Sequence, residues 1–248
     1  FQNTSALGIK PEDIGGTKLG ALGIPEFGTD FAMQMLMDTK PQYFSDLVRI
    51  AGLAHGTDVW LGNAQTLIKE GKATISTAIR TRDDIMIYLI QKGLDSEESF
   101  KIMEMVRKGK VASGKCKEWP EWKQDMIDHG VPDWYIWSCE RIKYMFPKAH
   151  AAAYVMMAWR VAYCKVFYPL AYYTAYFSIR ATAFDYEKMA MSPVRLEHYI
   201  AEYKAKKAEG TISNTEEDEL GVMRIVQEMH ARGYEFTPVS YTHLRAHE

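Results

Sequence analysis

The sequence contains few cysteines and no grouping of them that suggests a metal site. Only three of its 248 residues are cysteines, Cys116, Cys139 and Cys164. They are widely spaced, and the sequence has neither a CxxC pair nor a His/Cys cluster with the spacing of zinc ligands. This distribution argues against a zinc site and favours a reducing compartment. We therefore predict a cytoplasmic protein with no metal bound by this chain.

Long uncharged apolar runs are also absent. The most apolar stretch, residues 150–178, is interrupted by Arg160 and Lys165 and broken by Pro169. It therefore lacks the run of about 20 apolar residues that a membrane span needs, and a pair of buried helices is the better interpretation. The first ten residues have no secretion signal. Since the chain does not begin with methionine, we expect it to be part of a larger protein.

Neither sign of charge is in large excess. The formal net charge is -2, with 47% hydrophobic and 25% charged residues, which is an ordinary balance for a soluble globular protein. A protein coated in positive charge is excluded. Any contact with nucleic acid would have to come from a local basic patch.

Strand signals are nearly absent, whereas helical signals cover most of the chain. Apolar residues recur at the spacing of amphipathic helices, and helix-capping residues or glycines bound many of these segments. The predicted helices lie at 31–38, 43–54, 63–71, 83–93, 96–110, 122–130, 133–146, 193–210 and 215–233, and two more begin at Pro147 and Pro169. The fold class is therefore predicted to be all-α.

Four segments are predicted along the chain. Residues 1–29 are rich in glycine and are interpreted as loops, with one brief helix at Pro11 to Ile14. Residues 30–185 form the main helical domain, and residues 186–238 form a C-terminal helical segment. Residues 239–248 continue none of the earlier patterns, so we interpret them as a foreign tail and exclude them from the fold.

Three stretches carry polar residues that could form a site. In HGTDVWLGN, His55 and Asp58 could bind a metal, or the loop could simply cap the next helix. TRDDIM places Arg80 and Arg82 just before a helix N-terminus, where a guanidinium suits phosphate. Alternatively, Asp83 and Asp84 cap the helix and pair with the arginines. Residues 99–117 carry six basic residues against the single acid Glu104. This segment is either a solvated helix end or a contact for a phosphate backbone.

The stretch YMFPKAHAAAY places positive charge and aromatic rings beside a run of alanines. Pro147 starts a helix whose first turn holds Lys148 and His150, and the alanines allow a backbone or a flat ligand to approach closely. Alternatively, Tyr144 and Phe146 pack as a hydrophobic staple and the alanines mark a helix crossing. Chemistry alone leaves both interpretations open.

Several long segments occur in an order that resembles a known family. They are LGIPEFGT, AGLAHGTDVWLGNAQ, TRDDIMIYLIQKGL, FKIMEMVRKGK and RIKYMFPKAHAAAYV. Together they are similar to the fingers region of the PolC-type DNA polymerase III alpha subunit, and the similarity covers about residues 7–236. The resemblance implies template-directed DNA synthesis in the full protein, catalysed by two Mg²⁺ ions held on palm aspartates upstream of this region.

The resemblance also implies roles for individual residues. It predicts that Arg82 touches the triphosphate of the incoming nucleotide and that Tyr144 lies beside the nascent base pair, with Lys148 and His150 in support. It assigns His55, Asp58 and Asn63 to holding the fingers loop in shape. The basic residues expected to contact the DNA backbone are Lys101, Arg107, Lys108 and Lys110. Arg80 and residues 112–122 depart from the family pattern.

The expected partners follow from this interpretation. They are a DNA template-primer and deoxynucleoside triphosphates, with the sliding clamp and the rest of the replisome reached through other parts of the polymerase, and no membrane. Without the palm aspartates, the chain alone is predicted to be inactive. Two alternatives remain: a non-catalytic helical module that binds nucleic acid or nucleotide, and a helical scaffold whose basic patch has no function.

Overall fold

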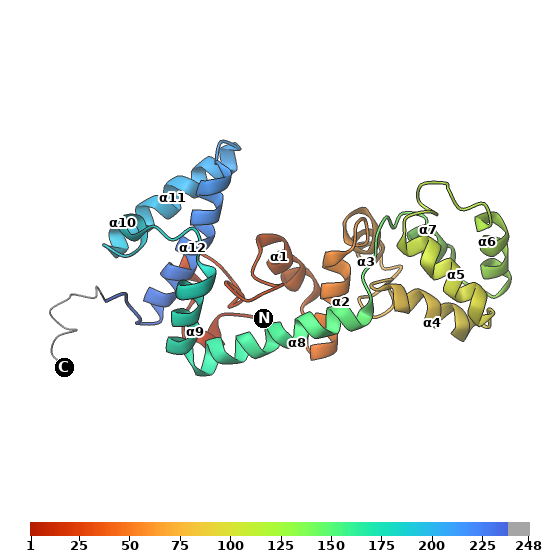
Figure 1. The fold of residues 1–248 in the computed structure, drawn as a ribbon, viewed down its shortest axis with the longest axis horizontal. Coiled ribbons are helices and arrows are strands. Elements are labelled where there is room, and N and C mark those ends of the chain that lie inside the picture. Colours follow the sequence, from red (N-terminus) through yellow and green to blue (C-terminus); the bar gives the residue numbers. More distant parts are fainter. Residues whose placement is uncertain (238–248) are drawn as a thin grey trace. The chain divides into compact units, whose positions relative to one another are not determined.

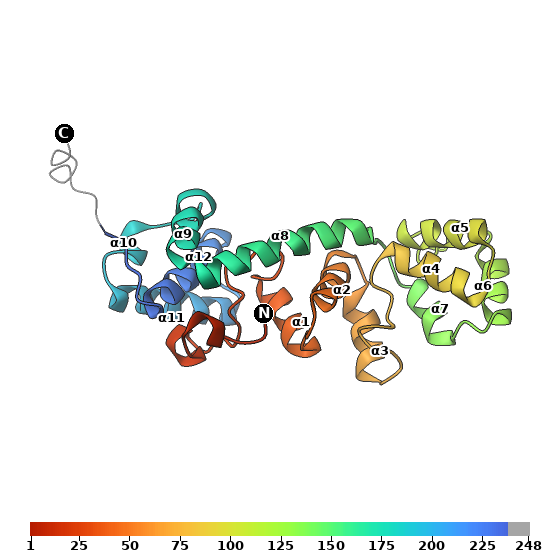
Figure 2. The same ribbon diagram turned by 90° about the horizontal axis from the view of Figure 1, so that it is seen from below.

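The structure is a computed structural model that describes residues 1–237, and their fold is all-α, as the sequence predicts (Figures 1 and 2). Over that range there is no β-strand, and a single antiparallel bridge joins Thr57 to Tyr144. No helix over the same range is long and apolar enough to cross a membrane. The predicted foreign tail, 239–248, lies outside the described residues.

The helices follow the predicted order. They are α1 (Asp30–Thr39), α2 (Phe44–His55), α3 (Gln65–Lys69), α4 (Arg82–Lys92), α5 (Ser96–Arg107), α6 (Trp119–Asp128), α7 (Asp133–Cys139), α8 (Lys148–Phe167), α9 (Pro169–Ala175), α10 (Tyr186–Met189), α11 (Pro193–Glu209) and α12 (Asn214–Ala231). The brief helix predicted at Pro11–Ile14 is confirmed as a 3₁₀ turn, and a second turn lies at Ser5–Leu7. The sequence pattern does not predict α10.

One predicted helix is wrong in its extent. The pattern at 133–146 predicts a single helix, but α7 ends at Cys139 and no helix covers the residues from there to α8. The backbone around Tyr144 instead pairs with a distant loop: Thr57 N donates to Tyr144 O at 2.9 Å, and Lys143 N donates to Thr57 O at 3.1 Å. Hydrogen bonds to that loop replace those of the predicted last turns.

Contacts divide the chain into two compact units. One unit is Pro25–Trp159, and the other joins Phe1–Ile24 to the residues from Arg160 on. This grouping differs from the predicted division, because apolar residues at the start of the chain pack against its later helices. Leu7, Ile9 and Ile14 form a buried cluster with Val166 and Ala231 against it. The predicted segments, as functional regions, stay a prediction.

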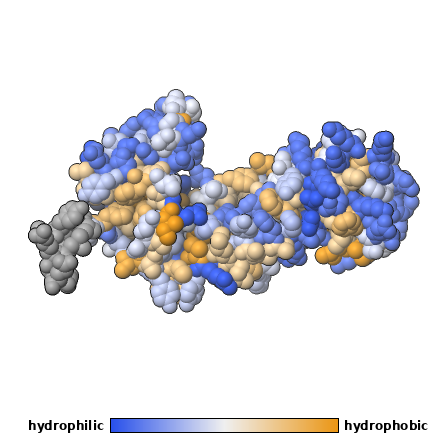
Figure 3. All heavy atoms as spheres, in the orientation of Figure 1, coloured by the Kyte–Doolittle hydropathy of each residue, from blue (hydrophilic) through white to orange (hydrophobic). Residues whose placement is uncertain are grey.

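Within the first of these units, α4 and α5 lie side by side (Figures 1 and 2). Ile85 and Leu89 of α4 and Ile102 and Val106 of α5 are fully buried in the core. The two helices run in opposite directions, so the start of α4 meets the end of α5. This pairing brings Arg82 to the basic residues near Arg107. The α4–α7 part presents mostly hydrophilic side chains on the face shown in Figure 3.

In the other unit, a buried ion pair joins α8 to α12. The Lys165 ammonium and the Glu228 carboxylate are both fully buried and 2.8 Å apart. The same ammonium donates to the carbonyl oxygens of Gly20 at 2.8 Å and Leu22 at 2.5 Å. Tyr173 donates to Glu228 at 2.7 Å. The network thus ties the chain segment before Ile24 to two helices.

Candidate functional site

Three of the predicted contact residues lie around one carboxylate, that of Glu104. Arg107 donates to its two oxygens at 2.8 and 2.9 Å. Lys108 lies 2.9 Å from it and Arg82 Nη1 lies 3.6 Å away. The hydrogen bond from Arg107 is the largest cause that lowers the pKa of Glu104 to about 2. Glu104 therefore stays ionised at neutral pH.

This cation cluster, Arg82, Arg107 and Lys108 around Glu104, keeps an excess of positive charge, because three cations share one carboxylate. The segment with Tyr144 lies beside this cluster, because Arg82 N donates to Phe146 O at 3.1 Å and the Phe146 ring contacts the Tyr144 ring. Residues predicted for the triphosphate and for the DNA backbone thus lie together. Both alternatives for TRDDIM stay open: Asp84 accepts from Thr81 N at 3.0 Å and pairs with Arg80, as the capping interpretation predicts, whereas the ion-pair partner of Arg82 is Glu104.

The other two predicted backbone contacts, Lys101 and Lys110, lie close to Arg107 and Lys108 in the sequence. Lys101 precedes Arg107 on α5 and pairs with Glu97 at 2.7 Å. Lys110 follows a turn at Gly109, which has φ +67°. An ideal Cβ at Gly109 would lie 2.5 Å from the Lys143 carbonyl oxygen, so the turn packs directly against the segment that leads to Tyr144.

The segment with Tyr144 and His150 is attached to the start of α4. Arg82 N donates to Phe146 O at 3.1 Å, and Asp83 accepts from Lys148 N at 2.6 Å. Asp83 therefore accepts a hydrogen bond from the first residue of α8, the helix that Pro147 precedes.

Aromatic contacts then connect the predicted residues. The Tyr144 ring meets Phe146 edge-on with centroids 5.4 Å apart, and the His150 ring stacks on Phe146 with centroids 4.9 Å apart. His55 also meets Phe146, at 5.5 Å. Tyr144 itself is 42% exposed. A flat ligand can therefore reach its ring while the neighbouring rings support it.

Residues at the loop after α2 make ion pairs and hydrogen bonds with other segments. His55 pairs with Glu26, and Lys143 pairs with Asp58 at 2.8 Å. Asn63 is fully buried and donates to Asp58 O at 2.9 Å, while Ser138 donates to Asn63 Oδ1 at 2.6 Å. Across residues 1–237, no three His, Cys, Asp or Glu side chains are grouped to hold a metal ion. The contacts join the loop to Glu26, Lys143 and Ser138, and its role in the polymerase stays a prediction.

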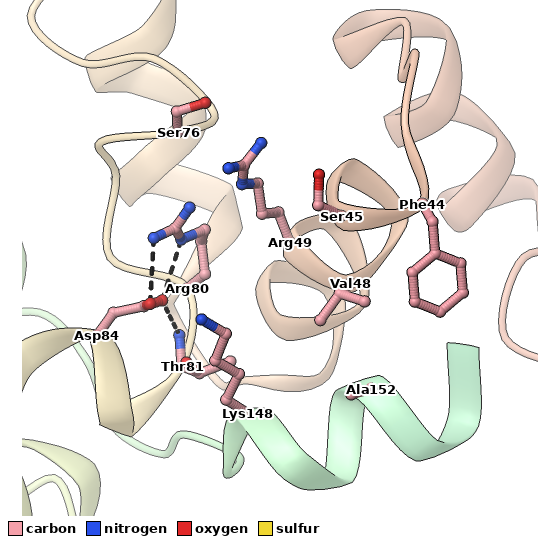
Figure 4. A pocket seen from close by; sticks show the side chains of 10 residues that line it. All are labelled: Phe44, Ser45, Val48, Arg49, Ser76, Arg80, Thr81, Asp84, Lys148 and Ala152. Carbon is pink, nitrogen blue, oxygen red and sulfur yellow. Dashed lines mark hydrogen bonds and ion pairs between the residues drawn. The ribbon is translucent and has the colours of Figure 1, made fainter. Parts of the chain in front are cut away.

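The sequence does not predict a basic pocket that lies at the start of α8. Arg49, Arg80 and Lys148 all line it (Figure 4). Only Lys148 is a predicted contact residue. Arg49 lies in α2 outside any motif. The sequence leaves the role of Arg80 open, because this residue departs from the family pattern. The excess of basic side chains around this pocket is visible only after folding, since they come from three separate segments.

Comparison with known proteins identifies the family. Residues 10–130 match the family described as bacterial DNA polymerase III alpha subunit finger domain. The chain is 54% identical over 236 residues to the DNA polymerase III PolC-type of Streptococcus suis. It is 52% identical over 239 residues to the proteins of the same name from Bacillus subtilis and Caldanaerobacter subterraneus subsp. tengcongensis.

These alignments cover nearly all of the chain but a small part of each relative. The matched residues are 95% of this chain for the Streptococcus suis protein and 96% for the other two, against 16% of each relative. The match includes α4, α5 and the segment with Tyr144, and the all-α fold agrees with a finger domain. The chain belongs to the PolC-type DNA polymerase III family and carries the finger domain of its alpha subunit.

Proposed function

We propose that this chain binds the incoming deoxynucleoside triphosphate and the template-primer as part of a replicative DNA polymerase. The observation that carries the proposal is the cation cluster around Glu104, which a hydrogen bond from Arg82 N to Phe146 O joins to the segment with the exposed ring of Tyr144. Positive charge suits the phosphates of a nucleotide, and a ring can stack on a base of any sequence. Family membership supports a polymerase over the two alternative classes.

The residues act by binding and orientation in this proposal. Arg82 offsets negative charge on the triphosphate, and Tyr144 stacks beside the nascent base pair. Lys148 and His150 support the same nucleotide from the start of α8. Lys101, Arg107, Lys108 and Lys110 contact phosphates of the DNA backbone. The Asp83 contact with Lys148 N keeps the start of α4 beside the start of α8.

The chemistry itself requires groups that these residues do not supply. Mg²⁺ activates the attacking oxygen and stabilises the leaving pyrophosphate when it is bound. No metal-binding group of three side chains occurs in the part of the chain that the structure describes. We place the catalytic aspartates and Mg²⁺ in another part of the polymerase, which acts in the cytoplasm and reaches the sliding clamp through further regions.

The isolated 248-residue chain is expected to extend no primer, because two-metal transfer needs those carboxylates. The measurement is primer extension on a labelled template-primer with Mg²⁺ and all four nucleotides. A polymerase of the family is the positive control. Magnesium-dependent extension by a preparation free of contaminating polymerase would place catalytic groups inside this chain.

Binding of duplex DNA by the chain is expected to weaken as salt rises and to be indifferent to sequence. Replacing Arg107, Lys108 and Lys110 by alanine should lower the log-log salt slope by about 0.9 for each phosphate that the variant no longer neutralises. The measurement is fluorescence anisotropy between low and moderate salt. A matched control replaces Lys18, Lys69 and Lys92, which are exposed elsewhere. If both triple variants bind alike, the basic segment is only a solvated helix end.

A further inference from the structure

The basic pocket is an open cavity of about 330 Å³ within residues 25–159. It lies between α2, the loop before α4 and the start of α8. Figure 4 shows Arg49, Arg80 and Lys148 reaching it from these three elements. Ser45 and Ser76 also line it, and both are exposed. The lining therefore offers cationic and hydroxyl donors together.

The pocket keeps positive charge after its internal ion pairs are counted. Arg49 donates one nitrogen, Nη1, to Asp46 at 2.6 Å. Arg80 donates Nε and Nη2 to Asp84 at 3.0 and 3.1 Å. Its remaining nitrogen, Nη1, makes a long contact of 3.4 Å with Ile75 O.

Lys148 is the third cation. Its backbone position is fixed, and its ammonium group remains available to a ligand. Its backbone N–H donates to Asp83 at 2.6 Å, so the residue is held at the first turn of α8. The side chain lines the pocket, and the residue is exposed. The ionisable residues that line the pocket are thus three cations and one carboxylate, that of Asp84, so the lining keeps an excess of positive charge.

We propose that Arg49, Arg80 and Lys148 form a phosphate-binding pocket distinct from the cation cluster around Glu104. Guanidinium groups bind phosphate oxygens in a fixed fork, and an ammonium adds a point charge. The inference rests on the proposed function in that the ligand is a nucleotide or a nucleic acid. The phosphate belongs either to a triphosphate tail or to the backbone of a strand.

Direct binding to the 248-residue chain tests the pocket with two probes, inorganic tripolyphosphate and a single-stranded oligo(dT). Lys148→Gln is the main variant, because it removes a charge without leaving a buried carboxylate unpaired. Affinity for the ligand that uses the pocket should fall by roughly tenfold or more, as for the loss of one charged hydrogen bond. Lys148→Arg should retain most of the affinity. Lys69→Gln, at an exposed position at the end of α3, is the matched control.

The outcomes separate the sources of the phosphate. A loss confined to tripolyphosphate assigns the pocket to a triphosphate tail, and a loss confined to oligo(dT) assigns it to a strand. Arg49→Gln should give the same loss as Lys148→Gln with the same probe. If neither probe binds more weakly to either variant than to Lys69→Gln, the pocket does not bind phosphate. An Arg82→Ala variant with weakened nucleotide binding would then show that the proposed function survives without the pocket.

Discussion

Replacing Arg82 by alanine in a full-length polymerase that contains this segment is expected to lower nucleotide incorporation per encounter by about tenfold to a thousandfold. This is the range for removing one strong electrostatic interaction of roughly 1.4 to 4 kcal/mol. Arg82 begins α4 and lies 3.6 Å from Glu104, which already binds Arg107 and Lys108. Because that carboxylate is shared, the Arg82 guanidinium keeps donors for a phosphate. Single-turnover incorporation across a nucleotide titration measures the effect.

The controls for Arg82 distinguish nucleotide binding from a structural role. Primer-template affinity should barely change in Arg82→Ala. Arg82→Lys should recover only part of the loss, because an ammonium lacks the bidentate fork. Lys92→Ala, at the other end of α4, removes a charge from the same helix and should leave incorporation unchanged. If the whole defect of Arg82→Ala lies in DNA binding or in folding, then Arg82 serves only the ion pair with Glu104.

Replacing Lys165 by methionine is expected to lower the free energy of unfolding by about 3–5 kcal/mol, the cost of removing one partner of a buried ion pair. Both Lys165 and Glu228 are fully buried. The variant leaves the Glu228 carboxylate without its cation and removes the donor that the carbonyl oxygens of Gly20 and Leu22 share. Burial lowers the pKa of Lys165, and the charge of Glu228 opposes that shift. Urea unfolding followed by circular dichroism measures the change.

Two further variants test the cause of that loss. Arg160→Met, at an exposed position of the same helix, should change stability by less than about 0.5 kcal/mol. The double variant Lys165→Met with Glu228→Gln should recover part of the loss, because no uncompensated charge then stays buried. A double variant less stable than Lys165→Met alone would mean that the unpaired carboxylate is not the main cost.

Local signals in the sequence are sufficient to predict most helices. The Asp84 side chain caps the start of α4, and Gly93 ends this helix. Pro147 precedes α8 and Pro169 begins α9, as the fixed φ angle of proline favours. Such signals act within a few residues, so the sequence alone carries them. They fail at residues 140–146, whose helical pattern is overridden by hydrogen bonds to Thr57, a residue far back in the chain.

The candidate site likewise has features that the sequence predicts and features that only the folded structure brings together. The sequence by itself determined the all-α class, the family and the short motifs that hold Arg82, Tyr144, Lys148 and His150, because each motif is a continuous segment. Only the tertiary structure decided that Glu104 joins Arg82 to Arg107 and Lys108, and that Arg49 and Arg80 share a pocket with Lys148. Their positions depend on the packing of α2, α4, α5 and α8. Contacts between segments far apart in the chain leave no periodic pattern or motif, so a single sequence does not display them.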